Sequence, residues 1–184
     1  MHLFRSAVLY AALALTANTA LADTAALEAL RTGDMMKLGF EAVPKEVPDI
    51  PFADADGGLH HLSEYQGKYV VLNFWATWCA PCRSEMATLD KLQGEMGSDR
   101  FAVLPIATLR NTVVGVKKFF AEDGVKNLQV RIDPDAALAR QMGVMGLPVT
   151  VILNPQGQEI ARLIGQADWD SDSAKAIFTA LLKG

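Results

Sequence analysis

The sequence predicts one α/β domain in which helices cover both faces of a central mixed sheet, after an N-terminal hairpin and a helical extension. With 184 residues, 51% of them hydrophobic and 21% charged, the chain can bury one proper core. Apolar runs alternate with amphipathic stretches in its second half, which is typical of parallel strands joined by helices. The last two apolar runs are separated only by a turn, so these strands are expected to pair antiparallel.

Residues 1–22 are predicted to be an export signal that is cleaved after Ala22. A basic start with Arg5 precedes an apolar run over residues 7–17, and residues 20–22 have the small-x-small cleavage pattern. The run is short for a hydrocarbon core of ~30 Å, and an uncleaved membrane anchor is the alternative. Cleavage would place the protein in the periplasm, which is oxidising. The expected division of the chain is 1–22, signal peptide; 23–44, helical extension and linker; and 45–184, main domain.

The first part of the mature chain is expected to hold a short helix, a linker and a hairpin. Apolar residues recur at helical spacing over 23–38, but Gly33-Asp34 interrupts them, so one short helix or two turns are predicted. Residues 40–51 contain three prolines, which favours an extended surface linker. Asp56-Gly57 is a pair typical of tight turns, so residues 52–62 are predicted to form a hairpin around it.

A buried strand and an amphipathic helix follow the hairpin. Residues 68–76 form a nearly continuous apolar run, as in strands covered on both faces. From residue 81 to about residue 96, apolar side chains recur at helical spacing. The remaining elements are predicted as a strand at 101–107 that Pro105 interrupts, helices at 112–122 and 135–142, strands at 149–153 and 159–164, and a closing helix from 170 or 171 to 182.

The two cysteines of the chain, Cys79 and Cys82, lie where the buried strand ends and the helix begins. Unpaired N–H groups and the positive end of the helix dipole favour a thiolate at Cys79. Pro81 suits the first helical turn, where its missing N–H loses no hydrogen bond. Cys82 faces inward and can close a disulfide. Cys79 is therefore predicted to attack a disulfide, and Cys82 to resolve the mixed disulfide.

A purely structural disulfide is the alternative for this pair. It would close a very short loop, which restrains the unfolded chain little, so a redox role is favoured. Haem attachment would need a histidine where Arg83 stands, and a four-thiolate zinc site would need two more cysteines. Neither a metal nor a cofactor is therefore expected.

Pro148 stands directly before the strand at 149–153, although a central strand seldom starts with a residue that cannot donate to its ladder. The position is explained if the Leu147-Pro148 bond is cis and the loop faces the dithiol, where the Leu147 backbone could pair with a substrate strand. An ordinary strand-entry proline is the alternative. Trp78, beside the nucleophile, is predicted to lie on an apolar docking surface, whereas Trp75 is expected to be buried.

Two stretches resemble the TlpA/ResA branch of the thioredoxin superfamily. Residues 73–86 read Asn-Phe-Trp-Ala-Thr-Trp-Cys-Ala-Pro-Cys-Arg-Ser-Glu-Met, and residues 143–148 read Gly-Val-Met-Gly-Leu-Pro. The resemblance covers about residues 45–184 and implies a thioredoxin-like fold, with Pro148 as the cis proline of the family and the two cysteines as its active pair. It also implies a thiol-disulfide reductase, since exported members of this branch mostly are, often in cytochrome c or copper-oxidase assembly.

The same resemblance implies a role for Glu85. ResA-like proteins have a glutamate three residues after the second active cysteine, and ordinary thioredoxins have a buried aspartate where this chain has Asn73. Because a neutral amide cannot take a proton, Glu85 is predicted to accept the proton of Cys82 during resolution. The alternative is a first-turn acid that only complements the helix dipole.

The predicted function is therefore an exported thiol-disulfide oxidoreductase that reduces disulfides of client proteins and is recharged by a membrane thiol-electron donor. Ala80-Pro81 lacks the histidine that strongly oxidising relatives place between their cysteines, which favours reduction. A net charge of −4 gives no basic footprint for nucleic acid, and a monomer is expected. A peroxidase is disfavoured, because no Pro-x-x-x-Thr-x-x-Cys pattern leads to Cys79.

The rival interpretation is a non-catalytic copper-handling or assembly module that uses the dithiol as a pair of ligands. His60 and His61 could suggest copper, but neighbouring residues on a strand face opposite sides and cannot readily chelate together. Retention of copper by the cysteines would favour the rival, and loss of disulfide reduction on mutating Cys79 would favour the enzyme.

Overall fold

The computed structural model describes residues 24–183. The predicted export signal at 1–22 lies outside these residues, so its cleavage stays a prediction. Across the described range, no helix is both long enough and apolar enough to span a bilayer.

A mixed sheet forms the centre of the described residues, with eight strands in the order β1-β8-β7-β4-β5-β6-β2-β3. β4 runs parallel to β5, and β5 runs parallel to β6. β4 also pairs antiparallel with β7, and β7 with β8, which confirms the predicted mixture. The strands are β1 (Gly39–Lys45), β2 (Phe52–Asp54), β3 (Leu59–His60), β4 (Tyr69–Trp75), β5 (Phe101–Thr108), β6 (Arg131–Asp133), β7 (Val149–Leu153) and β8 (Glu159–Ile164).

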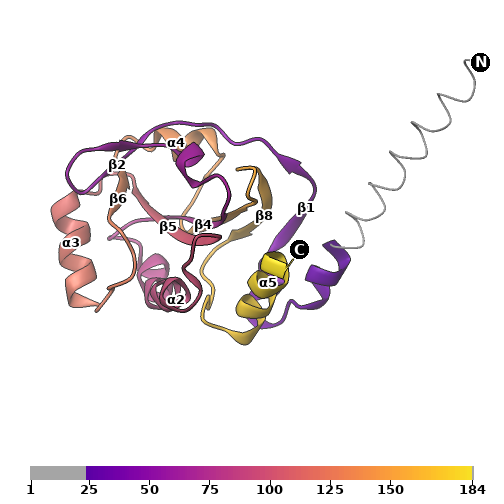
Figure 1. Cartoon of the computed structure of the whole chain (residues 1–184). Coiled ribbons are helices and arrows are strands. Elements are labelled where there is room, and N and C mark those ends of the chain that lie inside the picture. The colour runs from indigo at the N-terminus through magenta and orange to yellow at the C-terminus, as the bar shows by residue number, and fades with distance from the viewer. Residues whose placement is uncertain (1–23, 184) are drawn as a thin grey trace, which may run out of the picture.

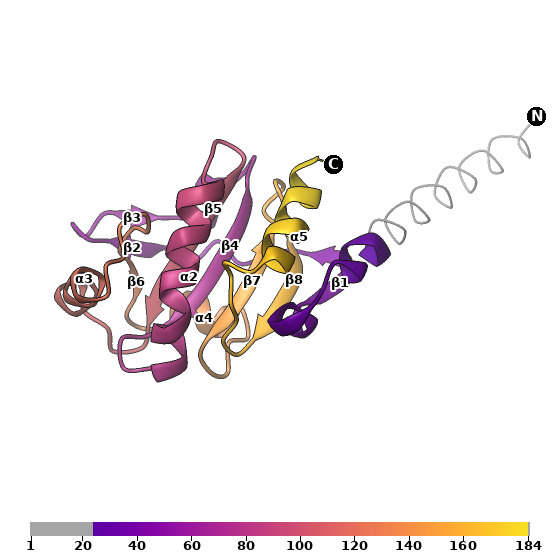
Figure 2. The same ribbon diagram turned by 90° about the horizontal axis from the view of Figure 1, so that it is seen from below.

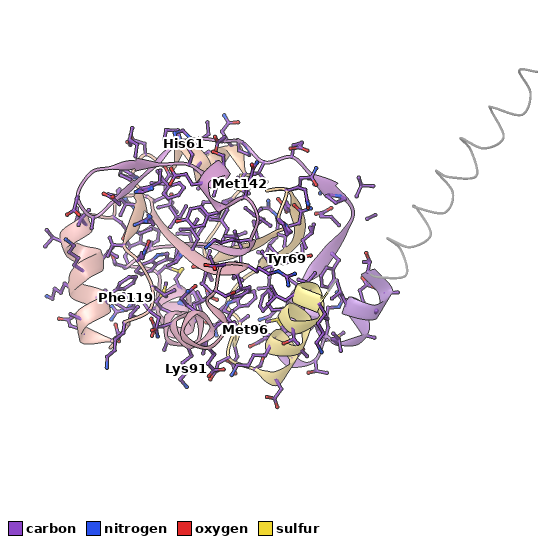
Figure 3. The ribbon with its side chains drawn as sticks, in the orientation of Figure 1. His61, Tyr69, Lys91, Met96, Phe119 and Met142 are labelled. Atoms are coloured by element: carbon purple, nitrogen blue, oxygen red, sulfur yellow. A yellow bond between two sulfur atoms is a disulfide. The ribbon has the colours of Figure 1, made fainter. Side chains whose placement is uncertain are left out.

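Helices cover both faces of this sheet, as predicted: α2 and α5 lie on one face and α4 on the other (Figure 1). Phe119 and Phe120 of α3 join the core beneath α2, where their rings lie 5.3 and 5.8 Å from that of Trp75. Figure 3 shows Met96 and Met142 on opposite sides of the sheet: Met96 packs against the core beneath α2, and Met142 belongs to a second core on the face that α4 covers. The helices are α2 (Ala80–Met96), α3 (Val113–Glu122), α4 (Ala137–Gln141) and α5 (Asp172–Lys183).

Two strands depart from the sequence prediction. The segment expected to be an extended surface linker, 40–51, begins within β1 (Gly39–Lys45), which is largely exposed but pairs antiparallel with β8 at the edge of the sheet, so its first residues form a strand that was not predicted. An edge strand tolerates Pro44, because the side of the strand without a neighbour needs no donor. The other strand, β6, is only three residues long and therefore shows no recognisable period in the sequence.

Pro105 does not interrupt β5, which is continuous. β6 pairs with β5 only at Ala107 and Thr108, so no strand lies beside Pro105 on this edge. Two residues earlier, the N–H of Val103 donates to the Gln93 side chain at 2.6 Å instead of to a strand. Strand alternation places the missing N–H of Pro105 on the same edge, where the sheet needs no donor.

The hairpin and the helical extension are both present. β2 and β3 pair around a turn in which Gly57 has a φ of 86°, a conformation that suits glycine. Residues 24–29 are helical, and a separate 3₁₀ turn, η1 (Gly33–Lys37), follows the interruption. Met35 and Leu38 are fully buried in the core under α2 and α5. The extension is therefore packed into the main domain.

Candidate active site

The site lies at the junction between β4 and α2. Cys79 is the N-cap residue of α2, and Pro81 lies in its first turn. A disulfide joins Cys79 to Cys82, whose Cα atoms are 5.3 Å apart. The N–H of Cys82 donates to Cys79 Sγ at 3.3 Å, so the first sulfur faces the unpaired N–H groups of the helix. The predicted joining of the two cysteines at a helix start is confirmed.

The two sulfurs differ in exposure. Cys79 is 7% exposed and Cys82 is fully buried, so only Cys79 offers a surface to another protein. The guanidinium of Arg83 lies 5.0 Å from the ring centroid of Phe119 and 3.7 Å from Asp123. Solvent screens such a half-exposed cation, which leaves the helix N-terminus as the main source of positive potential at Cys79.

The loop after β5 is fastened to the residue pair that precedes the disulfide. Buried Asn111 accepts hydrogen bonds from the N–H and the hydroxyl of Thr77 at 3.0 and 2.8 Å. Its amide nitrogen donates to the carbonyls of Thr108 and Leu109. Leu109 and Arg110 have φ values of 58° and 52°, which non-glycine residues rarely adopt. Asn111 therefore holds a strained loop beside the site, a role that sequence reasoning missed.

Trp78 is exposed beside the dithiol, and its role in docking a client stays a prediction. Its side chain is 54% exposed, and its indole N–H donates to the Leu109 carbonyl at 3.1 Å. Leu109, Met145 and Leu147 line a mainly apolar pocket of about 70 Å³. An apolar surface thus continues from Trp78 to the loop before β7. Trp75, in contrast, is completely buried, as expected.

The Leu147-Pro148 peptide bond is cis, as predicted. Val149, the first residue of β7, pairs with Phe74 near the end of β4. This register places Pro148 at the end of the sheet from which the chain leads to Cys79.

Glu85 lies one helical turn after Cys82 and is 2% exposed. Its carboxylate accepts hydrogen bonds from Asn73 Nδ2 at 2.8 Å, the Ala167 N–H at 3.0 Å and Trp169 Nε1 at 3.2 Å. Burial raises the pKa of Glu85 from 4.5 to about 7, although the three hydrogen bonds lower it. This environment differs from that of an exposed first-turn acid, whose pKa a helix N-terminus lowers.

Asn73 ties the Glu85 carboxyl to the centre of the sheet. It is fully buried on β4, and its Nδ2 also donates to Thr150 Oγ1 on β7 at 2.9 Å. An amide, a backbone N–H and an indole surround the carboxyl, and none of these groups titrates near neutral pH. Glu85 is therefore the member of this cluster that can hold or release a proton.

His60 and His61 are engaged by carboxylates around the hairpin. His60 lies 2.8 Å from Glu64 and 3.0 Å from Asp54, and the hydrogen bond to Glu64 contributes most to a raised pKa of His60. His61 lies 3.4 Å from Asp49. Within residues 24–183, no three or more His, Cys, Asp or Glu side chains are grouped to hold a metal ion.

Fold and site together define the class: a thiol-disulfide oxidoreductase with a thioredoxin-like fold. The sequence matches the AhpC/TSA family over residues 43–160, and the chain belongs to that family. It is 30% identical over 124 residues to the thiol-disulfide oxidoreductase ResA of Bacillus thuringiensis strain Al Hakam, a match that covers 67% of this chain and 70% of the relative. It is 35% identical over 114 residues to the thioredoxin-like protein YneN of Bacillus subtilis, a match that covers 61% of this chain and 66% of that protein.

Solved structures of the same fold agree with this assignment. A putative thiol:disulfide interchange protein DsbE from Chlorobium tepidum is 26% identical, with a TM-score of 0.66 over 76% of this chain and 96% of that one. The pneumococcal exposed lipoprotein thioredoxin Etrx1, from Streptococcus pneumoniae, is 27% identical, with a TM-score of 0.61 over 74% of this chain and 100% of that one. A secreted thiol-disulfide isomerase from Corynebacterium glutamicum is 25% identical, with a TM-score of 0.64 over 83% of this chain and 94% of that one.

Proposed function

We propose that this protein is exported and reduces disulfides of client proteins, with Cys79 as the attacking thiol and Cys82 as the resolving thiol. The observation that carries the proposal is the joined pair at the start of α2, with one sulfur at the surface, the other hidden, and the Glu85 carboxyl buried one turn behind. Disulfide reduction needs a nucleophile that a client can reach, a second thiol to release the client, and a group that accepts its proton.

The reaction starts from the reduced pair. The Cys79 thiolate attacks one client sulfur, the client disulfide breaks, and the other client sulfur leaves as a thiolate. The Cys82 thiol gives its proton to Glu85 and attacks Cys79 Sγ, which forms the Cys79–Cys82 bond and expels the second client thiolate. Two electrons pass from the pair to the client, whose thiolates take protons from solvent. A membrane thiol-electron donor then reduces the pair again.

The surroundings of Glu85 support its role as the proton acceptor. A pKa of about 7 makes the carboxylate and the acid almost equally populated at neutral pH, which suits a group that takes up a proton and gives it up in each cycle. Glu85 and Cys82 face inward from the same helix, one turn apart. Cys82 is fully buried, so its proton has no ready acceptor in bulk water, and Glu85 is the titratable group beside it.

Trp78, Leu147 and Pro148 are proposed to bind the client beside Cys79. The exposed indole offers apolar area with little conformational freedom to lose, and the neighbouring apolar pocket extends this surface. An extended client segment along the loop at Leu147 would bring its disulfide to Cys79.

The same proposal includes export to the periplasm after cleavage at Ala22. It also divides the mature chain into an extension at 23–44 and a main domain at 45–184. Export is supported by the apolar N-terminal run and by relatives described as an exposed lipoprotein and a secreted isomerase. In this proposal the clients take part in cytochrome c or copper-oxidase assembly, and the protein is a monomer. No observation favours the copper-handling alternative over this function.

The deciding experiment is turnover with a protein disulfide. Cys79→Ser is expected to reduce insulin, with dithiothreitol as the electron source, about a hundredfold more slowly than the wild type, because the nucleophile is lost. Cys82→Ser is expected to accumulate covalent mixed disulfides with its clients, which non-reducing electrophoresis reveals. Unchanged insulin reduction by Cys79→Ser would refute the proposed function.

A further inference from the structure

A second opening reaches Glu85 from a side that the client surface does not use. A pocket of about 190 Å³ is walled by residues of α2, including Ser84 and Glu85, by the loop after β8, and by η1. One water needs roughly 10–15 Å³ of such space, so the pocket has room for several. Neither Trp78 nor the cysteine pair lines it.

The N-terminal segment forms the mouth of this pocket. Asp34 and Lys37 of η1 form an ion pair of 2.8 Å, and each remains more than 40% exposed. Asp34 accepts a hydrogen bond from the Asp168 N–H at 3.1 Å, and Lys37 Nζ donates to the Gln166 carbonyl. Two charged side chains therefore fasten η1 to the loop between β8 and α5, beside which the N-terminal segment lies in Figure 2.

The polar groups of the wall suit the movement of protons. The Ser84 hydroxyl donates to Gln166 Oε1 at 3.1 Å, and Thr88 also lines the pocket. Water in the space between these residues would connect the solvent at Asp34 to Glu85.

The catalytic cycle leaves the proton of Cys82 on Glu85 after each resolution. That proton either stays until reduction of the pair returns it to Cys82 or leaves to solvent, and the second course needs an exit at this place. Cys79 is only 7% exposed, and a client joined to it would cover the remaining surface there.

We propose that Glu85 exchanges its proton with solvent through this pocket, and that Asp34 and Lys37 are positioning residues that hold its mouth. The inference rests on the proposed role of Glu85 as the proton acceptor. In this step the O–H bond of Glu85 breaks, a pocket water takes the proton and passes it to bulk water, and no electrons are transferred.

The charged side chains that face Glu85 come from η1 and from the loop after β8. η1 contributes Asp34 and Lys37, the loop after β8 contributes Asp168, and the partners from β4 and β7 are neutral. Lys37 is the cation in this group, and its charge lowers the pKa of Glu85 in opposition to burial.

The first test fills the pocket. Ser84→Trp is expected to slow turnover at saturating client about tenfold, because the indole displaces the waters, while alkylation of Cys79 keeps its wild-type rate. Ala87→Trp is the matched control, since Ala87 is exposed on the same helix and does not line the pocket. Wild-type turnover by Ser84→Trp would overturn the route.

The second test reads the Glu85 carboxyl directly, by ¹³C NMR of the disulfide form, in which no thiol titrates. Lys37→Met is expected to raise the midpoint by about half a pH unit, and Lys37→Arg to restore it. Lys118→Met, which removes an exposed lysine of α3, is the control and should leave the midpoint unchanged. An unshifted midpoint in Lys37→Met would overturn the role of η1.

A failure of the proposed role of Glu85 as proton acceptor can be distinguished from a failure of the pocket route. If Glu85→Gln resolves mixed disulfides with the pH profile of the wild type, Glu85 is not the proton acceptor, whatever the pocket variants do. If Glu85→Gln changes that profile but Ser84→Trp turns over normally, the proposed function stands and the route falls.

Discussion

At the scale of single residues, the first turns of α2 place two reactive side chains, Cys79 and Glu85, in different electrostatic environments. Cys79 lies at the helix N-terminus, where unpaired N–H groups favour a negative charge although only 7% of the residue is exposed. Glu85 lies one turn beyond the pair, inside the protein, where lost hydration disfavours its charge and three hydrogen bonds offset only part of that loss. Thiolate and neutral acid can therefore coexist on one helix near neutral pH.

Glu85→Gln is expected to flatten the pH dependence of stability. Folding raises the pKa of Glu85 from 4.5 to about 7, so between these values the folded protein keeps a proton that the unfolded chain has lost. The free energy of unfolding therefore falls as the pH rises through this window and levels off above it, by about 3 kcal/mol in total. Urea unfolding of the disulfide form at a series of pH values measures the difference between variant and wild type.

The comparison isolates this carboxyl, because all other titrating groups are common to the two proteins. Glu122→Gln, at an exposed position on α3, is the matched control and should keep the wild-type slope. Parallel curves for Glu85→Gln and the wild type would show that Glu85 does not hold its proton into this pH range.

At the scale of elements, the junction between β4 and α2 depends on the loop after β5. This loop adopts two consecutive left-handed residues, Leu109 and Arg110, and Asn111 fastens it to Thr77 on the other side. The same loop accepts the indole N–H of Trp78. A single buried amide thus orders both the approach to the disulfide and the exposed apolar surface beside it.

Asn111→Ala is expected to destabilise the protein by about 2 kcal/mol, because the N–H of Thr77 and two carbonyls lose their partner. Insulin reduction is expected to slow as well, since Trp78 loses its support from Leu109. Urea unfolding and turnover measure the two effects. Thr77→Val removes only the hydroxyl and should have a smaller effect than Asn111→Ala; an Asn111→Ala protein as stable and active as the wild type would contradict this account.

At the scale of the whole molecule, the N-terminal extension belongs to the folded unit. Thr32 donates its N–H to Ser173 Oγ of α5 at 3.0 Å, and the Ser173 hydroxyl donates to the Leu30 carbonyl at 2.7 Å. Met35 and Leu38 are completely buried in the core that α2 and α5 share. Apolar burial and hydrogen bonds therefore tie the chain before β1 to its last helix.

Met35→Ala is expected to lower the free energy of unfolding by about 2–5 kcal/mol, because it leaves a cavity in that core. Met36→Ala is the matched control: the neighbouring side chain is 62% exposed, and its loss should change stability by less than about 0.5 kcal/mol. Urea unfolding of both variants gives the comparison. Equal stability of Met35→Ala and Met36→Ala would mean that the extension contributes nothing to the core.

The candidate site could be predicted from the sequence only where its signals are local. The cysteine pair and Pro81 stand at a strand-to-helix junction, which hydrophobic periodicity and helix-start preferences locate within a few residues. Asn111 and Trp169 could not be found in this way, because Thr77 lies 34 residues from the first and Glu85 lies 84 residues from the second.

Hydrophobic periodicity, turn residues and the spacing of two thiols determined the order of most helices and strands and the position of the dithiol, because each of these signals acts over a few neighbouring residues. Tertiary structure alone decided that residues 39–45 complete the sheet, that Pro105 has a strand beside it only on the β4 side, and that Glu85 is buried. Pairing and burial are made by segments far apart in the chain, so they depend on the assembled sheet and its two covering layers.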